Sequence, residues 1–392
     1  MNRKDIIELM KDVYTSKEAA EYLNISSQRL NQLVHDKKIE PIKISKSIML
    51  FLKSDLDERK ISNISNINTT HLENHLDINN YFIREVILYY TIQQYFNNND
   101  KKTMNFIDQI KSAYQFDFKN KLVDNIPLLS KALQVSDKDF YNQYLKVKNS
   151  FLTLDENVVI TKKGDEIYSK LLNSTNEAPP YLFLKGNIDL LNEKSVCVVG
   201  SRNASSESLE KTAKIVKSLV HRNIVINAGL AKGIDTAAHQ SALKNGGKTI
   251  AVIGTPINQY YPKENRELQN EIANKGLLVS QFPPCNKVQR WNFPIRNGVM
   301  SGLSIATIIM EAGETSGALK QADYALKQKR DVFIPQSALE NKLIKWPQKY
   351  VSRGAHSFKN LKDVLKILNK NQLLYNIFNE EDMEELSYVE MD

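Results

Sequence analysis

Apolar runs and glycine-containing breaks alternate along the second half of the chain, in the pattern of a parallel α/β fold. An apolar run over residues 196–199 breaks into Gly200-Ser201-Arg202, and a helix-like segment follows over residues 205–220. A second apolar run, residues 224–226, breaks into a loop that begins at Gly229. Strand, helix and strand in this order predict a βαβ unit.

Further apolar runs extend this unit into an α/β fold with a Rossmann-like, doubly wound and mostly parallel sheet. The predicted strands are residues 195–199, 224–227, 249–253, 277–280, 304–310 and 331–334. If their order is the common 3-2-1-4-5-6, the switch point lies between the first and the fourth strand. The loop of residues 281–297 would then face Gly200-Ser201-Arg202 across that crevice.

The N-terminal region has the pattern of two short helices followed by a small hairpin. Thr15 or Ser16 can cap a helix that continues to Leu23, and residues 27–35 form the second helix after a turn. Apolar residues then alternate from residue 42 to residue 50, as in a wing. The stretch resembles the excisionase and MerR-type winged helix-turn-helix, although Ser45 stands where that family turns on glycine.

This resemblance implies contact with duplex DNA, because the second helix of such a module enters the major groove. Polar side chains of that helix would meet bases or phosphates, and lysines of the wing would meet phosphates. A helix-turn-helix also serves as a protein-docking or dimerisation unit, so both roles stay open. The candidate contacts are Gln28, Arg29, Asn31, Gln32, Lys43 and Lys46.

A low-complexity Asn/Ser/Ile stretch separates this module from the rest and predicts a linker. The following segment is helical, and its end resembles a second winged helix with residues 135–137 as the turn and residues 158–162 in the wing. Five regions result. They are 1–60 (winged helix-turn-helix), 61–75 (linker), 76–177 (helical, with the possible second winged helix), 178–358 (Rossmann-like) and 359–392 (C-terminal helix and acidic tail).

Charge is distributed unevenly along the 392 residues, whose net charge is +8. Residues 181–358 contain 24 Lys and Arg against 13 Asp and Glu, whereas residues 359–392 contain 4 against 8. The Rossmann-like part therefore has the basic excess of a polyanion-binding surface. Cys197 and Cys285 show no metal or redox spacing, and no segment has the length of a membrane span, so we expect a cytoplasmic protein without a metal.

The two glycine loops predict an anionic ligand at the carboxyl edge of the sheet. Each loop carries a cation, Arg202 or Lys232, and each precedes a helix whose N-terminus favours an anion. The alternative is that the glycines only close tight turns. Only the first glycine of a dinucleotide fingerprint is present and no phosphate-binding loop of the GxxxxGK[ST] type occurs, so a nicotinamide cofactor and ATP hydrolysis are not supported and we expect no cofactor.

Seven blocks of the sequence resemble, in order, those of the DNA-processing protein A (DprA, or Smf) family. They are VGSR (199–202), AGLAKGIDTAAH (228–239), GGKTIAVIGT (246–255), YYPKEN (260–265), NFPIRN (292–297), EAGETSGAL (311–319) and RDVFIP (330–335). The resemblance implies an extended Rossmann fold that binds single-stranded DNA and passes it to a RecA-type recombinase, and we expect a homodimer. The phosphate-binding candidates are Gly200, Ser201, Arg202, Lys232, Gly233, Lys263, Arg290 and Arg296.

Aromatic residues lie among the cations of the loop at residues 281–297. Lys287 and Arg290 would bind phosphates, while Trp291 and Phe293 would stack on bases, which is the combination used for sequence-tolerant binding of single strands. The alternative for both aromatic residues is that they anchor the loop to the core.

Two further functions stay open at this stage. The crevice could hold a nucleotide signal, in a regulatory or antitoxin-like component of a mobile-element or phage-defence system. It could also be the site of a nucleotide-processing enzyme, but Asp235, His239 and Glu311 do not converge by spacing with a nucleophile or a metal cluster. Asp235 and His239 stand four residues apart on one helix, where the acid can cap and the imidazole can pack. We therefore expect a binding protein without catalytic residues.

Overall fold

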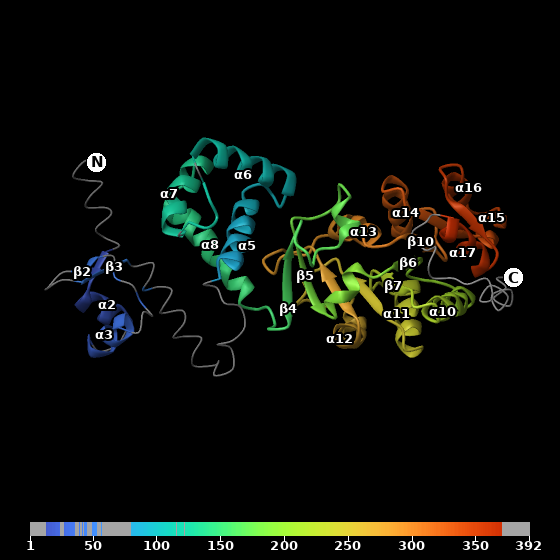
Figure 1. Cartoon of the computed structure of the whole chain (residues 1–392), viewed down its shortest axis with the longest axis horizontal. Helices are drawn as coiled ribbons and strands as arrows, with labels where there is room; N and C mark the ends of the chain where they lie inside the picture. Colours follow the sequence, from blue (N-terminus) through green and yellow to red (C-terminus); the bar gives the residue numbers. More distant parts are fainter. Residues whose placement is uncertain are drawn as a thin grey trace. The chain divides into compact units, whose positions relative to one another are not determined.

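The computed structural model describes residues 13–23, 27–35, 39, 41, 43–44, 49–52, 56, 80–114, 116–120 and 122–370. They belong to two compact units, Met1–His75 and Leu76–Asp392 (Figure 1). Among these residues, no helix combines the length and the apolar character needed to cross a membrane. The predicted linker and the acidic tail after residue 370 lie outside the described residues.

The first unit contains the predicted helix-turn-helix and hairpin. Its first helix begins with a reciprocal cap, because Glu18 accepts a hydrogen bond from the Thr15 N–H at 2.8 Å and the Thr15 hydroxyl accepts one from the Glu18 N–H at 3.4 Å. Apolar side chains of both helices and of the central strand, among them Leu30 and Phe51, form a small core. The elements are β1 (Val13–Thr15), α2 (Ser16–Leu23), α3 (Ser27–His35), β2 (Lys43–Ile44) and β3 (Met49–Leu52), with strand order β1-β3-β2.

The second unit begins with helices whose aromatic side chains pack against the large sheet. Tyr90 lies 6.0 Å from Phe183 between ring centroids. The buried carboxylate of Glu85 accepts hydrogen bonds from the Tyr181 hydroxyl at 3.0 Å and from the Lys162 ammonium at 2.6 Å, and it therefore fastens the first of these helices to two strands. The helices are α5 (Tyr81–Gln94), α6 (Asp100–Tyr114), α7 (Leu122–Leu133) and α8 (Asp137–Phe151).

The prediction of a second winged helix is wrong for the residues that were assigned to its wing. The turn between α7 and α8 is present, but residues 158–162 form strand β4 (Val158–Lys162), which pairs antiparallel with β5 (Tyr181–Gly186) at the edge of the large sheet. The predicted boundary at residue 178 is therefore wrong as well. The strand before this boundary and the strand after it are neighbours in one sheet.

Nine strands within residues 158–358 form one sheet, in the order β12-β11-β10-β6-β7-β8-β9-β5-β4. The seven strands from β12 to β9 run parallel. The central strand β6 is buried on both faces and rich in valine, as expected for a parallel strand covered by helices. Their bounds are β6 (Ser195–Val199), β7 (Val225–Ala228), β8 (Thr249–Val252), β9 (Leu277–Ser280), β10 (Ala306–Ile309), β11 (Asp331–Pro335) and β12 (His356–Phe358).

This order corrects the expected 3-2-1-4-5-6. The first four predicted strands, β6 to β9, lie side by side in sequence order, and the fifth, β10, returns to the free side of β6. The switch point therefore lies between the first and the fifth strand. The chain crosses back from β9 to β10 through one long connection that contains α13 (Asn292–Gly302).

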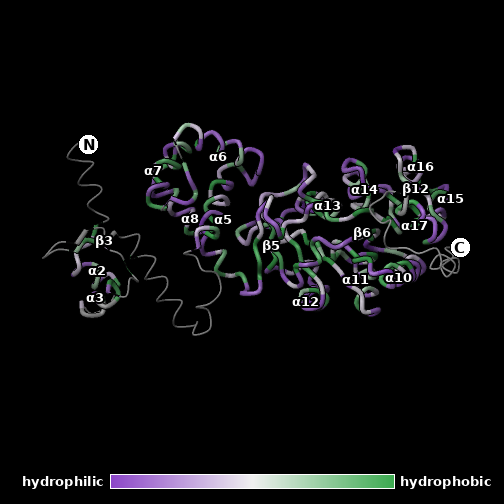
Figure 2. The backbone as a smooth tube through the Cα atoms, viewed as in Figure 1, coloured by the Kyte–Doolittle hydropathy of each residue, from purple (hydrophilic) through white to green (hydrophobic). Residues whose placement is uncertain are grey.

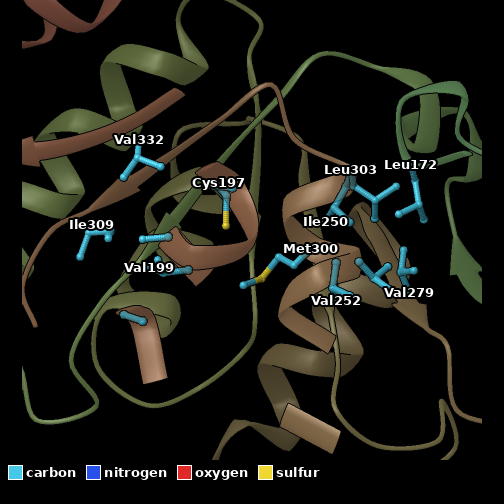
Figure 3. Close-up of a cluster of buried hydrophobic side chains, with 14 of the residues drawn as sticks. Leu172, Cys197, Val199, Ile250, Val252, Val279, Met300, Leu303, Ile309 and Val332 are labelled. Atoms are coloured by element: carbon cyan, nitrogen blue, oxygen red, sulfur yellow. The ribbon is translucent and has the colours of Figure 1, made fainter. Parts of the chain in front are cut away.

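Helices cover both faces of the sheet, and apolar positions gather along the strands and the helix faces that meet them (Figure 2). Met300 of α13 and Leu303, which follows this helix, pack beside Ile250 and Val252 on one face (Figure 3). The same face carries α14 and α16. Helices α10, α11 and α17 pack on the opposite face. The remaining helices are α9 (Lys170–Asn173), η1 (Ile188–Asn192), α10 (Ser206–Val220), α11 (Ile234–Lys244), η2 (Lys263–Asn265), α12 (Arg266–Lys275), α14 (Gly317–Lys327), α15 (Gln336–Glu340), α16 (Trp346–Val351) and α17 (Leu361–Lys370).

Helix α17 belongs to the core of the sheet domain, which corrects the predicted boundary at residue 358. Leu361, Val364, Leu365 and Leu368 are buried in the same cluster as Phe358 of β12. Only the residues after 370 remain for the predicted tail.

Candidate nucleic-acid interface

The switch point at β6 opens a cavity of about 770 Å³ at the carboxyl edge of the sheet. After β6 the chain continues into α10 on one face, and after β10 it continues into α14 on the other face. The two loops touch where the Ser201 N–H donates to the Glu311 carbonyl oxygen at 2.7 Å and diverge beyond this contact, so the space between them is open to a ligand. We call this space the switch-point cavity. Its lining comes from the loop after β6, the loop after β7, Tyr261, the stretch from Arg290 to Met300, and residues 313–321.

The predicted partners across this cavity are brought together. Gly200, Ser201 and Arg202 line one side, while Arg290, Phe293 and Arg296 line the other. The loop of residues 281–297 thus faces the first glycine loop as expected, although the strand order that suggested it is different. It does so because α13 crosses from β9 toward β10 over the ends of the intervening strands.

Gly200 and Gly233 hold the two loops against each other. A Cβ atom on Gly200 would lie 2.6 Å from Ile234 Cγ1 and 2.8 Å from the Glu311 carbonyl oxygen. Gly233 has φ = 76°, and a Cβ there would lie 2.2 Å from the Ser201 carbonyl oxygen. Both glycines are therefore required by close packing between protein segments, which is the turn-closing alternative considered for them.

Carboxylates of the protein accept hydrogen bonds from the backbone N–H groups that were expected to bind a phosphate. Glu311 accepts hydrogen bonds from the Ser205 N–H at 3.0 Å and from the Ser205 hydroxyl at 2.9 Å, at the start of α10. Although burial raises it, hydrogen bonds from Ser208 and Ser205 lower the pKa of Glu311 below its usual value. Asp235 accepts from the N–H groups of Gly229 at 2.9 Å and Ala231 at 3.4 Å. An anionic ligand must therefore be bound mainly by side-chain cations.

Arg296 is not exposed to solvent, as a direct phosphate contact would be. Its side chain is buried, and its guanidinium donates to the carbonyl oxygens of Gly229, at 2.6 Å, and of Val252. Burial lowers the pKa of Arg296, and the charge of Asp235 opposes that shift. Burial likewise raises the pKa of Asp235, and the charge of Arg296 counteracts it. Arg296 is thus placed to hold the wall of the cavity in position.

The other predicted cations occupy two different places. Arg202 and Arg290 are exposed and line the cavity. Lys232 forms an ion pair with Glu264 at 2.7 Å, with both side chains more than half exposed. Lys232, Lys263 and Lys287 are exposed at the carboxyl edge but are not part of the cavity lining.

The two predicted aromatic residues differ in environment. Trp291 is 60% exposed, whereas Phe293 is half-buried, with its ring centroid 4.9 Å from that of Tyr261. Phe293 also covers Gly254, where an added Cβ would lie 2.6 Å from the ring. Trp291 is therefore available to a nucleobase, and Phe293 both lines the cavity and anchors its loop.

Four side chains are prominent among the lining residues that sequence reasoning missed. Tyr261 lines it after β8, and Ser316, Lys320 and Gln321 line it after β10. Ser316 caps α14 by accepting a hydrogen bond from the Ala318 N–H at 3.3 Å. For Tyr261 and Ser316 the signal was present in the blocks YYPKEN and EAGETSGAL, because both follow predicted strands and therefore lie at the carboxyl edge. Lys320 and Gln321 directly follow the second block.

The three acid-base candidates form hydrogen bonds within the fold, and one of them, Asp235, lines the cavity. His239 is fully buried, with Nδ1 2.7 Å from the Thr249 hydroxyl, and it does not line the cavity. In the part of the chain that is described, no three His, Cys, Asp or Glu side chains gather as metal ligands.

The candidate duplex contacts of the first unit lie on the expected elements. Gln28, Arg29, Asn31 and Gln32 belong to α3, and Lys43 belongs to β2. The side chain of Asn31 is exposed. Lys46 and the side chains of the other four lie outside what the structure describes.

The parallel sheet, with the switch-point cavity at its carboxyl edge, defines an α/β protein of the Rossmann type. Residues 159–369 match the family model of DNA recombination-mediator protein A, and residues 13–62 match a helix-turn-helix domain. The chain belongs to the DNA recombination-mediator protein A family.

Similar proteins match part of the chain. The chain is 45% identical to the DNA processing protein DprA of Streptococcus pneumoniae over 177 residues, which are 45% of this chain and 62% of that protein. It is 36% identical to the Smf protein of a Synechocystis species over 225 residues, 56% of this chain and 54% of that protein. The chain thus spans less than two thirds of either relative. The crystal structure of the S. pneumoniae protein aligns with a TM-score of 0.59 and 31% identity, over 71% of this chain and 97% of that one.

Proposed function

We propose that this protein binds single-stranded DNA in the switch-point cavity, without catalysing a reaction on it. The observation that carries the proposal is the convergence of exposed Arg202 and Arg290 with Phe293 on one cavity, while Trp291 is exposed next to Arg290. Arginines that bind phosphates beside rings that stack on bases are the usual means of holding a single strand regardless of its sequence. The family membership and the names of its relatives as DNA processing proteins support the same ligand.

The proposed roles of the site residues follow from their positions. Arg202 and Arg290 bind phosphates inside the cavity, and Lys320 adds a third cation at its wall. Lys232 and Lys263 contribute at the outer edge, while Gly200, Ser201 and Gly233 shape the loop that carries Arg202. Arg296 acts as a positioning residue.

The wider assembly is part of the same proposal. The resemblance to the DprA family supports delivery of the bound strand to a RecA-type recombinase by a homodimer in the cytoplasm. The helix-turn-helix model over residues 13–62 supports contact between α3 and duplex DNA. One chain would then hold a single strand at its sheet and a duplex at its N-terminal unit.

Fluorescence anisotropy of labelled DNA tests the central claim. Wild type and Arg202→Ala are titrated with a strand of ~20 bases and with the matching duplex, each over a salt series. We expect tight binding of the single strand, a steep fall of log K with log salt, and a shallower slope with lower affinity for the variant. Lys214→Ala, on an exposed position of α10, is the matched control.

Two results would overturn the proposal. If Arg202→Ala and Lys214→Ala bind the single strand equally well, the cavity is not the DNA site. If a mononucleotide binds with submicromolar affinity and the single strand does not compete with it, the cavity holds a small ligand instead.

A further inference from the structure

A second group of cations lies at the carboxyl edge beyond the cavity, at the ends of β11 and β12. Residues 341–370 contain eight Lys and Arg and a single acid, Asp363. Because β10, β11 and β12 are parallel, the segments that follow them emerge at the same edge as the cavity. Lys342 and Lys345 follow β11 and α15, and Lys359 follows β12 directly. We call these three residues the distal lysines.

The backbone connects the distal lysines to the cavity wall. Glu314 stands between Gly313 and Thr315, which both line the cavity, and it accepts hydrogen bonds from the N–H groups of Lys345 and Trp346, the latter at 3.1 Å. The Trp346 indole donates to the Ala312 carbonyl oxygen at 2.7 Å. The segment that carries Lys345 is therefore fixed directly against the loop that forms the cavity wall.

Lys359 is fixed at the same edge by strand register. Phe358 is paired with Pro335 in the sheet, so Lys359 begins the segment beside the start of α15. Its N–H donates to Asp363 at 2.9 Å, in the cap of α17. Lys345 and Lys359 are thus held by backbone hydrogen bonds at one edge, and Lys342 lies in the turn that precedes Lys345.

The ammonium groups of the distal lysines form no ion pairs among the described residues. Among residues 122–370, none of the three forms an ion pair within 4.0 Å, whereas Lys232 pairs with Glu264 and Lys320 with Asp323 at 3.5 Å. The neighbouring acids bond elsewhere, because Glu314 and Asp363 accept from backbone N–H groups and Glu340 accepts from the Gln336 side-chain amide at 2.9 Å. Each lysine is exposed, and Leu343 between two of them is 91% exposed.

We propose that a single strand bound in the cavity continues across the ends of β11 and β12, where Lys342, Lys345 and Lys359 bind its phosphates. This inference rests on the proposed function of the cavity and assigns the direction in which the strand leaves it. Unpaired cations in a row next to an anion site attract a continuous polyanion, because each phosphate contact releases counterions. Leu343 offers an apolar surface to the bases between them.

A length series tests the path with a triple variant, Lys342→Gln, Lys345→Gln and Lys359→Gln. Its affinity is measured for a strand of ~6 bases, which fills the cavity, and for one of ~20 bases, which passes beyond it. We expect binding of the short strand to be unchanged and binding of the long strand to weaken by on the order of tenfold or more at 0.15 M salt. The salt slope of the long strand should fall by about 2, since each lost phosphate contact on a single strand removes about 0.7.

The matched control carries the same change in charge at the opposite edge. Lys194, Lys275 and Lys329 are exposed and precede β6, β9 and β11. The triple Lys→Gln variant at these positions should bind both strands like the wild type. Equal losses in the two triple variants would overturn the path, because net charge alone would then explain the effect.

Two other results would also overturn the path. One is unchanged binding of the long strand by the distal variant. The other is a lower molar mass of that variant in analytical ultracentrifugation with equal losses for both strands, which would make this surface a protein interface. If the cavity does not bind single-stranded DNA at all, the result is different, because binding of the short strand would then not depend on Arg202.

Discussion

The guanidinium of Arg296 donates a hydrogen bond to the carbonyl oxygen of Gly229 across 2.6 Å, and this contact ties α13 to the loop after β7. A second hydrogen bond from the same nitrogen reaches Val252 at the end of β8. The Arg296 Nε donates to the Asn297 side-chain oxygen at 3.1 Å. One buried side chain therefore fixes the helix that carries the cavity wall to the ends of two strands.

Replacing Arg296 with alanine should destabilise the fold. The change leaves the carbonyl oxygens of Gly229 and Val252 without their donor and leaves the buried charge of Asp235 less compensated. We expect the free energy of unfolding to fall by about 3 kcal/mol, measured by urea denaturation. Arg290→Ala, at an exposed position of the same cavity, should change it by less than about 0.5 kcal/mol while weakening DNA binding. A stable Arg296→Ala variant that had lost only DNA binding would instead make Arg296 a direct phosphate contact.

The strands and their breaks could be predicted because each is a local apolar run ended by glycine or a polar loop. Their order could not, because it depends on which side of β6 the long connection after β9 returns to. Local sequence does not encode that choice. The edge strand β4 was missed for a similar reason, since the turn at residues 135–137 and an amphipathic strand are equally compatible with a winged helix.

Gly233→Ala should damage the loop that carries Arg202. A Cβ at this position would lie 2.2 Å from the Ser201 carbonyl oxygen, and the backbone φ of 76° is itself unfavourable for alanine. We expect a loss of about 2–3 kcal/mol in the free energy of unfolding and weaker binding of single-stranded DNA. Both quantities are measured on the same preparation, by denaturation and by anisotropy.

Gly246→Ala is the matched control for this substitution. Its φ is 70°, but no atom lies within 4 Å of an added Cβ. The free energy of unfolding of this variant should fall by only about 1 kcal/mol, the cost of a positive φ for alanine. The variant should bind DNA like the wild type. Equal effects of the two substitutions would show that backbone strain, and not the clash with Ser201, accounts for the loss.

Trp291→Ala and Phe293→Ala should separate base stacking from anchoring. Trp291 is 60% exposed, so its loss should leave the free energy of unfolding unchanged. The free energy of binding to a single strand should weaken by about 1–3 kcal/mol. Phe293 packs on Tyr261 and covers Gly254, so its loss should reduce both stability and affinity. Unchanged DNA binding by Trp291→Ala would remove the stacking role from this residue.

The composition of the site could be predicted only in part. Arg202 and Arg290 were found because loops after parallel strands share one edge, and a cation in such a loop stands out in the sequence. The burial of Arg296 was not foreseeable, because its partners Gly229, Val252 and Asp235 belong to elements that are distant in sequence. The hydrogen bonds of Glu311 to Ser205 at the start of α10 were not foreseen either, because the two residues are more than 100 positions apart.

The last prediction concerns pH and arises from the buried His239. The Thr249 hydroxyl donates to the Ile226 carbonyl oxygen at 2.8 Å and therefore accepts from Nδ1–H of His239 at 2.7 Å. Nε2 is then the unprotonated nitrogen, and it has no hydrogen-bond partner within the residues that the structure describes. Burial, followed by the charge of Arg296, lowers the pKa of His239 to about 3.

Protonation of the unfolded chain should therefore destabilise the protein in mild acid. An unfolded histidine has a pKa of about 6.5, so between pH 6.5 and about 3 the unfolded state binds a proton that the folded state does not. The contribution of neutral His239 to the free energy of unfolding is complete above pH 6.5 and is lost as the pH falls, by about 2 kcal/mol at pH 5. Asp235, whose pKa is raised by burial, contributes in the opposite direction in acid, so urea denaturation must compare wild type with His239→Gln at each pH. The difference between the two proteins should shrink steadily from pH 7 to pH 5, whereas a difference that is constant over this range would contradict a neutral, buried His239.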